Sequence, residues 1–264
     1  MNLLFTANKN YLIHIVEVLS SIRAHNGDHL DVYIISNDIK ENDFKEFENI
    51  LKDMSFVTMS IDESFFKKGR TSSRYPLDIY YRLFASFFLP KDMDRILYLD
   101  PDIAVIGNLK ELYHMPFNDN MFIGASHLSG FLLRLNQLKN GVKKDHLYIN
   151  TGVILMNLEL MRKNVKKEEI YETIQKKRWI MTLPDQDVLN ILYGDKITLV
   201  SQFKYNIADR DITKYNLFHK NKIDLKWIKN NTVIIHYYGR NKPWKKSYKG
   251  ILNAFYVNMK EKEN

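Results

Sequence analysis

The sequence predicts one α/β domain with a mixed, mainly parallel central sheet flanked by helices. Between Asn2 and Ile61, short strand-like runs alternate with amphipathic helical segments, an alternation typical of parallel βαβ units. The chain has 264 residues, of which 45% are hydrophobic, so it can bury one large core. No internal repeat or low-complexity tract divides it.

The N-terminal segments set this alternation. A strand is expected over Asn2–Thr6. A helix follows from about Asn10, because apolar residues recur there at helical spacing, and His25–Gly27 ends it. The next expected elements are a strand, a charged amphipathic helix and a third strand, over Leu30–Ser36, Glu41–Lys52 and Phe56–Ile61.

The rest of the chain continues the mixed pattern. The polar segment Lys67–Arg74 is predicted as a loop, and a helix over Asp78–Phe88 is stopped by Pro90. A loop is expected over Ser126–Lys144, where it would shape the acceptor side of a site. Further strands are expected over Met121–Ala125, Tyr148–Met156 and Thr232–His236, and further helices over Val165–Lys177 and Asp185–Tyr193.

Composition narrows the function classes. The chain has no cysteine, which excludes disulfides, thiolate metal sites and a cysteine nucleophile. The net charge of +8 suits nucleic acid, an anionic membrane or phosphorylated substrates. The basic residues are dispersed and no nucleic-acid motif occurs, so nucleic acid is not an expected partner. The N-terminus does not resemble a signal peptide, and cytoplasmic residence is expected.

Two carboxylates stand at the end of an apolar run. The run that starts at Arg95 has strand character, is interrupted by Asp100, Pro101 and Asp102, and resumes at Ile103. Such a pair is costly to bury unless a cation neutralises it, and oxygen ligands suit Mg²⁺ or Mn²⁺ bound to substrate phosphates. The pair therefore indicates a divalent-metal site at the carboxyl end of a sheet. An ordinary Asp-Pro-Asp turn explains the same residues.

Two further segments place polar residues in apolar surroundings. Asn150 and Gly152 interrupt an apolar run, which indicates close approach by a ligand or else a β-bulge. A helix is expected to begin at Asp185, Gln186 and Asp187. Capping of the helix explains Asp185 or Asp187, but it explains Gln186 less well.

The segment around His236 adds a third set. A neutral imidazole at a strand end is a candidate metal ligand, although a structural histidine is the alternative. Gly239 allows the backbone to approach a phosphate, and Lys242 supplies a positive charge for it. The residues after the first strand, up to Tyr11, stand where an open α/β sheet binds its ligand. Tyr11 could stack on a base or pack on a helix face.

Together these segments resemble glycosyltransferase family 8, in particular its retaining bacterial lipopolysaccharide galactosyl- and glucosyltransferases. The resemblance is carried by Tyr-Leu-Asp-x-Asp, Asn-x-Gly, Asp-Gln-Asp and His-x-x-Gly-x-x-Lys-Pro-Trp, in the family's order between Asn2 and Trp244. It implies a Rossmann-like GT-A catalytic domain over residues 1–244. It also implies a UDP-glucose or UDP-galactose donor and a Mn²⁺ cofactor, with Mg²⁺ as the substitute.

The resemblance assigns roles to individual residues. The implied metal ligands are Asp100, Asp102 and His236. The implied UDP-binding residues are Thr6, Ala7, Asn8, Asn10, Tyr11, Arg82, Asp100, Pro101, Gly239 and Lys242. The implied donor-sugar residues are Arg82, Asn150, Gly152, Asp185 and Gln186. The family often has Asp where this chain has Asn8, which makes strict uracil selection less secure than metal binding.

The resemblance also implies transfer of a hexose to an acceptor hydroxyl with retention of anomeric configuration. Gln186 is the candidate catalytic residue near the reacting carbon, together with Asp185. An amide is a poor nucleophile, so we expect front-face attack with both side chains stabilising an oxocarbenium-like state. A catalytically inactive nucleotide-sugar binding protein is the alternative, and the intact site residues argue against it.

The tail over residues 245–264 is predicted as a basic amphipathic helix. Ile251, Phe255 and Met259 recur at helical spacing among lysines. Such a helix could rest on the inner membrane face, near a glycan or glycolipid acceptor of the lipopolysaccharide type, or it could pack on the catalytic domain.

Overall fold

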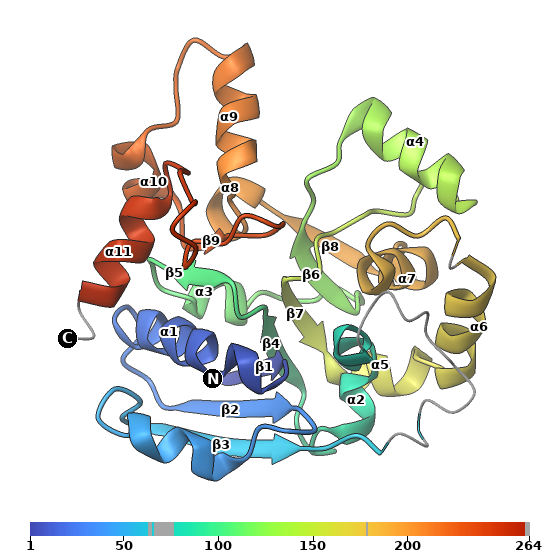
Figure 1. Ribbon diagram of the computed structural model, residues 1–264. Coiled ribbons are helices and arrows are strands. Elements are labelled where there is room, and N and C mark those ends of the chain that lie inside the picture. Colours follow the sequence, from blue (N-terminus) through green and yellow to red (C-terminus); the bar gives the residue numbers. More distant parts are fainter. Residues whose placement is uncertain (63–64, 66–76, 178, 262–264) are drawn as a thin grey trace.

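A seven-stranded mixed sheet lies at the centre of the protein in the computed structural model (Figure 1). The structure describes residues 1–62, 65, 77–177 and 179–261, so the loop expected over Lys67–Arg74 and the last residues of the tail lie outside the described part. The strand order is β3-β2-β1-β4-β7-β6-β8. The strands are β1 Asn2–Thr6, β2 Leu30–Ile35, β3 Met54–Met59, β4 Arg95–Leu99, β6 Phe122–Ala125, β7 Val153–Asn157 and β8 Ile197–Val200.

The sheet is mainly parallel, as the sequence predicts. β1 pairs in parallel with β2 and with β4, β2 pairs in parallel with β3, and β6 pairs in parallel with β8. β7 runs antiparallel to both of its neighbours, β4 and β6. The change of direction at β7 places the ends of β1 and β4 beside the turn that leads into β7, where the polar residues of the sequence gather.

A second, two-stranded sheet joins two segments that are far apart in the sequence. β5 (Ile103–Val105) pairs antiparallel with β9 (Ile234–His236), and Ile103 stands opposite His236 in the register. This pairing brings the segment after β4 against the C-terminal third of the chain.

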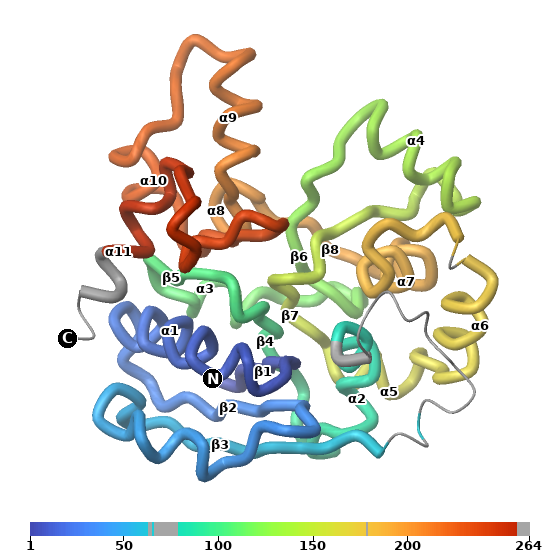
Figure 2. The backbone as a smooth tube through the Cα atoms, in the orientation of Figure 1, coloured from blue at the N-terminus to red at the C-terminus, as the bar shows by residue number. Residues whose placement is uncertain are grey.

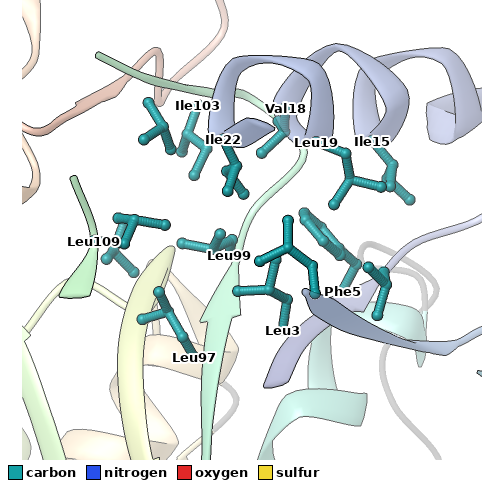
Figure 3. Packing of buried hydrophobic residues seen from close by; sticks show 14 of the residues in the cluster. Leu3, Phe5, Ile15, Val18, Leu19, Ile22, Leu97, Leu99, Ile103 and Leu109 are labelled. Atoms are coloured by element: carbon teal, nitrogen blue, oxygen red, sulfur yellow. The ribbon is translucent and has the colours of Figure 1, made fainter. Parts of the chain in front are cut away.

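Helices cover both faces of the large sheet. Because strand side chains alternate, Leu3 and Phe5 join one apolar layer and Leu4 joins the other. Figure 3 shows Leu3 and Phe5 facing Ile15 and Leu19 across the first layer. The helices are α1 Leu12–Arg23, α2 Ala85–Phe88, α3 Lys110–Tyr113, α4 Gly130–Asn140, α5 Leu158–Asn164, α6 Lys167–Lys177, α7 Pro184–Tyr193, α8 Gln202–Tyr205, α9 Asp209–Phe218, α10 Leu225–Asn231 and α11 Asn253–Glu261.

Four expected segments differ clearly in the structure. Instead of an α-helix over Glu41–Lys52, the chain forms the 3-10 helix η2 (Glu41–Phe47), which buries only Phe44 and so lacks an apolar face to stabilise a longer helix. The helix expected from Asp78 is a 3-10 helix, η4 (Leu77–Phe84), that continues as α2; another 3-10 turn, η1 (Lys9–Tyr11), precedes α1.

The third difference concerns the expected loop over Ser126–Lys144, most of which is helix α4. Gly141 ends this helix in the left-handed conformation, with φ of 66°. The strand expected from Tyr148 begins only at Val153. Residues 148–150 are irregular, with backbone N–H groups that bond to Asn190 and Ala125, and a turn at residues 151 and 152 leads into β7.

The C-terminal helix α11 packs against α1 on the left of Figure 2. Leu252 and Tyr256 are buried there, and the Tyr256 hydroxyl donates a hydrogen bond of 2.9 Å to Glu17 Oε2. The apolar side of the tail is therefore covered by the protein. Among the described residues, no helix combines the length and the apolar composition that crossing a membrane requires.

We expect Tyr256→Phe to destabilise the protein by about 1–3 kcal/mol, because a buried Glu17 carboxylate loses a donor. Urea unfolding followed by circular dichroism measures the change. Tyr33→Phe is the matched control, since within the described residues its hydroxyl forms no hydrogen bond, and it should change the unfolding free energy by less than about 0.5 kcal/mol. Equal stability of Tyr256→Phe and the wild type would contradict a supporting role for the tail.

Candidate functional site

Two carboxylates lie where the central strand β4 ends. Asp100 follows the strand, and its backbone N–H donates to Gly152 O at 2.8 Å. Asp102 stands just before β5, and its carbonyl accepts from Tyr237 N at 2.8 Å. Backbone bonds to two different segments thus fix both residues at the carboxyl end of the sheet, where open α/β sheets bind ligands.

His236 completes a cluster with these carboxylates. Its Nε2 lies 3.2 Å from Asp102 Oδ1 and 3.8 Å from Asp100 Oδ2. Its Nδ1 lies 2.9 Å from the amide oxygen of Asn206, which can only accept, so Nδ1 carries the proton. In the neutral ring, the lone pair of Nε2 therefore faces the two carboxylates.

The cluster fits a divalent cation. One ligand atom from each residue can be chosen so that all lie within 4.8 Å of one another. Asp102 Oδ1 and His236 Nε2 are both buried and, within the described part of the chain, neither has a hydrogen-bond partner. Two facing buried acceptors are unfavourable unless a cation lies between them, and imidazole with carboxylates is a suitable ligand set for a first-row divalent ion.

Lys242 reaches the same cluster from the segment after β9. Its ammonium contacts Asp102 Oδ2 and donates to Tyr237 O at 3.1 Å. Burial raises the pKa of Asp102, but the positive charges beside it, the protonated form of His236 and the Lys242 ammonium, outweigh burial and hold that pKa below its ordinary value. Asp102 is therefore ionised and available as a ligand at neutral pH.

Arg82 links the cluster of Asp100, Asp102 and His236 to a further carboxylate, that of Asp185. Its guanidinium Nη1 lies 3.0 Å from Asp100 Oδ1 and 3.4 Å from Asp185 Oδ2, and donates to Thr151 O at 2.9 Å. The group also lies over the ring of Tyr98, 4.4 Å from its centroid. Burial lowers the pKa of Arg82, but the surrounding carboxylates, Asp100 first, raise it above its ordinary value.

Asp185 and Gln186 enter the site from the first turn of α7. Thr151 Oγ1 donates to Asp185 Oδ2 at 3.0 Å, and Asn150 Nδ2 donates to Gln186 Oε1 at 3.2 Å. Burial raises the pKa of Asp185, and Arg82 opposes that rise. The capping role belongs to Asp187, whose Oδ2 accepts from the backbone of residues 182 and 183. Asp185 and Gln186 are left to face the site.

A cavity of about 200 Å³ lies at the end of β1 and is lined in part by Asp100 and Asp102 of the cluster. Tyr11 lies on its wall with 36% of its surface exposed, and Asn8 accepts from Asn10 N at 3.2 Å to begin η1. Asn10 and Gly239 are outside the lining. The lining consists of Thr6, Ala7, Asn8, Tyr11, Ile79, Arg82, Asp100, Pro101, Asp102 and Lys242.

Glycine is needed at Gly239 and at Gly152 for different physical reasons. Gly239 has φ of 97°, a conformation that favours glycine. Gly152 lies so close to the cluster that an added Cβ would stand 2.7 Å from Asp100 Oδ2 and 2.8 Å from His236 Nε2. The close approach expected at Gly152 is thus made by the side chains of the cluster itself.

The structure adds supporting residues that sequence analysis missed. Asn206 is fully buried and joins His236 to Asn150, donating from Nδ2 to Asn150 Oδ1 at 3.1 Å. The Tyr98 hydroxyl donates to Asp100 Oδ1 at 2.6 Å. Asn206 stands in none of the sequence motifs, and only its place in the fold reveals that it orients the cluster. Tyr98 is the first residue of the Tyr-Leu-Asp-x-Asp motif, but only the structure shows its contact with Asp100.

Comparison with known proteins agrees with this geometry. The model of the family described as glycosyl transferase family 8 matches residues 2–247. The chain is 27% identical to lipopolysaccharide 1,2-glucosyltransferase of Escherichia coli, covering 92% of this chain and 73% of that protein. It is 28% identical to lipopolysaccharide 1,3-galactosyltransferase of Salmonella typhimurium, covering 92% and 72%. Against glycosyltransferase GlyF of Streptococcus pneumoniae, the identity is 26%, and the chain spans only 57% of that longer protein.

The fold matches as well. The crystal structure of galactosyltransferase LgtC in complex with donor and acceptor sugar analogs superposes with a TM-score of 0.80 at 22% identity. The match covers 99% of this chain and 96% of that one. The sheet is that of the GT-A glycosyltransferases, and the family match spans nearly the whole chain, so this protein belongs to glycosyltransferase family 8.

Proposed function

We propose that the protein transfers a hexose, glucose or galactose, from a UDP-sugar to an acceptor hydroxyl with retention of configuration. The observation that carries the proposal is the continuity between the acidic cluster and the cavity at the end of β1. A nucleoside diphosphate needs a pocket for its base beside a cationic site for its phosphates, and the two adjoin here. The catalytic unit is proposed over residues 1–244, with 245–264 as its tail.

Asp100, Asp102 and His236 would hold Mn²⁺, or Mg²⁺ in its place. When bound, such a cation would offset the charge that develops on the leaving diphosphate. Asp102 Oδ1 and His236 Nε2 are buried in the cluster. Among the described residues neither atom has a hydrogen-bond partner, and this supports the assignment.

The nucleotide would occupy the adjoining cavity. Tyr11 is exposed enough to stack on the base, and Asn8 offers an amide to the base edge. Lys242 would hold the diphosphate, exchanging its contact with Asp102 for the phosphate oxygens. Thr6, Ala7, Asn10, Pro101 and Gly239 complete the UDP-binding set that we propose.

The donor sugar would lie between Arg82 and the first turn of α7. Arg82 is fixed by two carboxylates and a carbonyl, so its position is set before substrate arrives. Asp185 contacts the Arg82 guanidinium, and its carboxylate would face the developing oxocarbenium-like centre. Gln186, held by Asn150, would orient the sugar, with Gly152 beneath it.

The proposed acceptor is a cell-surface glycan or a glycolipid of the lipopolysaccharide type. Its support is the function named for the Escherichia coli and Salmonella relatives, which act on lipopolysaccharide. We propose a cytoplasmic enzyme that reaches the inner membrane face, helped by the exposed lysines of the tail, Lys245, Lys246 and Lys249.

Release of UDP from UDP-glucose and UDP-galactose tests the proposal. We expect slow hydrolysis of one donor with Mn²⁺, loss of hydrolysis with EDTA, and acceleration by a matching acceptor. Binding of UDP-sugar without any turnover would instead indicate the inactive binding protein. Metal-independent binding, or no binding, would remove the proposed donor site.

We expect Gln186→Ala to lower kcat by about 100-fold while changing the affinity for UDP by less than about twofold, because the side chain would act on the sugar and lies outside the lining of the proposed nucleotide cavity. Steady-state kinetics and UDP titration separate the two effects. Gln202→Ala, on α8 outside the site, is the control. Full activity of Gln186→Ala would remove the catalytic role.

A further inference from the structure

Exposed apolar side chains gather on two helices that flank the site. On α4, Phe131 is 74% exposed and Leu138 is 62% exposed, and two more leucines of the helix are about half exposed. At the end of α9, Leu217 is 74% exposed and Phe218 is 73% exposed. We call this set the apolar rim: Phe131, Leu132, Leu135, Leu138, Leu217 and Phe218.

The rim is tied to the mouth of the site. His127, just before α4, contacts Asp211 in the first turn of α9, with Nδ1 lying 3.2 Å from Oδ1. His127 also lies beside Tyr238, whose ring is 5.1 Å from that of His236. His127 before α4 and the first turn of α9 therefore lie near His236, and Figure 1 shows both helices in the upper part of the view.

The segments that carry the rim residues are rich in basic residues. Residues 126–144 contain Arg134, Lys139, Lys143 and Lys144 and no Asp or Glu. Residues 212–223 contain three lysines and likewise no acidic residue. Exposed apolar side chains on segments rich in basic residues match an anionic lipid surface, where the apolar groups enter the acyl boundary and the cations meet the headgroups.

The segment between α6 and α7 continues this surface. Lys139 Nζ donates to Thr182 Oγ1 at 3.1 Å, and Lys177 Nζ donates to Asn140 O at 3.1 Å, so the segment is held against the end of α4. Trp179 in this segment is 83% exposed. Tryptophan favours the interfacial region of a membrane, so the exposure of Trp179 also favours contact of this surface with a membrane.

We propose that the apolar rim docks the enzyme on an anionic membrane, with the mouth of the active site facing the lipid. This surface differs from the tail. The tail is equally basic, but Leu252 and Tyr256 are buried against the protein, and α11 lies on the other side of the view from α4. The tail supplies charge, whereas the rim supplies the apolar groups that enter the bilayer.

Co-sedimentation with phosphatidylglycerol–phosphatidylcholine vesicles and with pure phosphatidylcholine vesicles tests the proposal. We expect the wild type to prefer the anionic vesicles and to lose binding as salt rises. Phe131→Ser/Leu138→Ser and Leu217→Ser/Phe218→Ser should each lower the partition coefficient at least about tenfold. All four side chains are mostly exposed, so neither pair should affect folding.

Ile251→Ser/Val257→Ser on the tail is the matched control, because these side chains are 41% and 42% exposed but lie outside the rim. It should leave the partition coefficient within about twofold. Trp179 provides a second readout: its emission should shift to the blue with anionic vesicles, and Trp179→Phe should remove that shift. Absence of vesicle binding by the wild type, or loss confined to the tail variant, would overturn the proposal.

Two further measurements separate the other outcomes. Light scattering of the wild type and the rim variants detects a second copy as the occupant, and a dimer that dissociates in the variants without vesicle binding would overturn membrane docking. Hydrolysis of UDP-sugar without vesicles should be unchanged in the rim variants. Failure of the donor chemistry would therefore leave the docking result standing, and the reverse also holds.

Discussion

Asp102→Asn is expected to weaken metal-dependent UDP binding by at least about 100-fold while the protein stays folded. Asn keeps the shape of the side chain but removes the negative charge that contacts Lys242 and that would bind the cation. Loss of groups that merely support a ligand costs about 10- to 100-fold in metal affinity, and loss of a ligand should cost at least as much. The backbone bond from Tyr237 N to residue 102 is unaffected, so the turn remains in place.

Isothermal titration with UDP, with and without Mn²⁺, measures this effect. Asp145→Asn makes the same chemical change at an exposed position and should bind as the wild type does. A thermal melt followed by circular dichroism checks the fold of both variants. If Asp102→Asn bound UDP with unchanged metal dependence, the cluster would not be the donor's metal site.

Gly152→Ala is expected to be nearly as damaging, although alanine adds only one methyl group. The added Cβ would lie 2.7 Å from Asp100 Oδ2 and 2.8 Å from His236 Nε2, closer than such contacts allow. His236 is buried and held by Asn206, so it cannot swing away freely. We expect at least about a 100-fold loss of activity and a stability loss of about 1–3 kcal/mol.

Gly27→Ala is the matched control, because Gly27 is exposed and an added Cβ would meet nothing within 4 Å. Activity assays and urea unfolding should show the control close to the wild type. Where Gly152→Ala proves too unstable to assay, crystals or spectra of its Co²⁺ complex report the displaced imidazole directly. Wild-type activity in Gly152→Ala would mean that the ligands tolerate displacement.

Part of the cluster can be predicted from the sequence because two of its residues, Asp100 and Asp102, lie in one short segment. The paired carboxylates of Asp100 and Asp102 interrupt an apolar strand, and that cost of burial is visible without a structure. His236 could be joined to them only through the family resemblance, since no local pattern relates residues so far apart. Asn206, which fixes the imidazole, was missed for the same reason.

The fold shows a similar division. Strands with nearly continuous buried runs, such as Asn2–Thr6, are predicted within a residue. β8 (Ile197–Val200) was missed because it is a short edge strand whose Leu199 is 45% exposed, which leaves no clear apolar pattern. The loop expected over Ser126–Lys144 is mainly α4, whose apolar residues point outward and so do not report a packed face.

The helix that starts at Pro184 shows where local rules leave alternatives. Capping explains an acidic residue in the first turn, and the sequence alone offers Asp185 and Asp187 equally. The structure separates them, because Asp187 accepts from the backbone before the helix while Asp185 contacts Arg82. The distinction depends on the direction of each side chain, which one residue of spacing changes by about 100°.

The pairing of β5 with β9 also determines when the enzyme becomes competent during its synthesis. Asp102 leaves the ribosome long before His236, and the two meet only when Ile103 pairs with the strand that ends at His236. Closing so long a loop is entropically costly and slow compared with forming the neighbouring βαβ units. A nascent chain therefore lacks both His236 of the cluster and Lys242 of the adjoining cavity, and we expect catalytic competence to appear as a late event of folding.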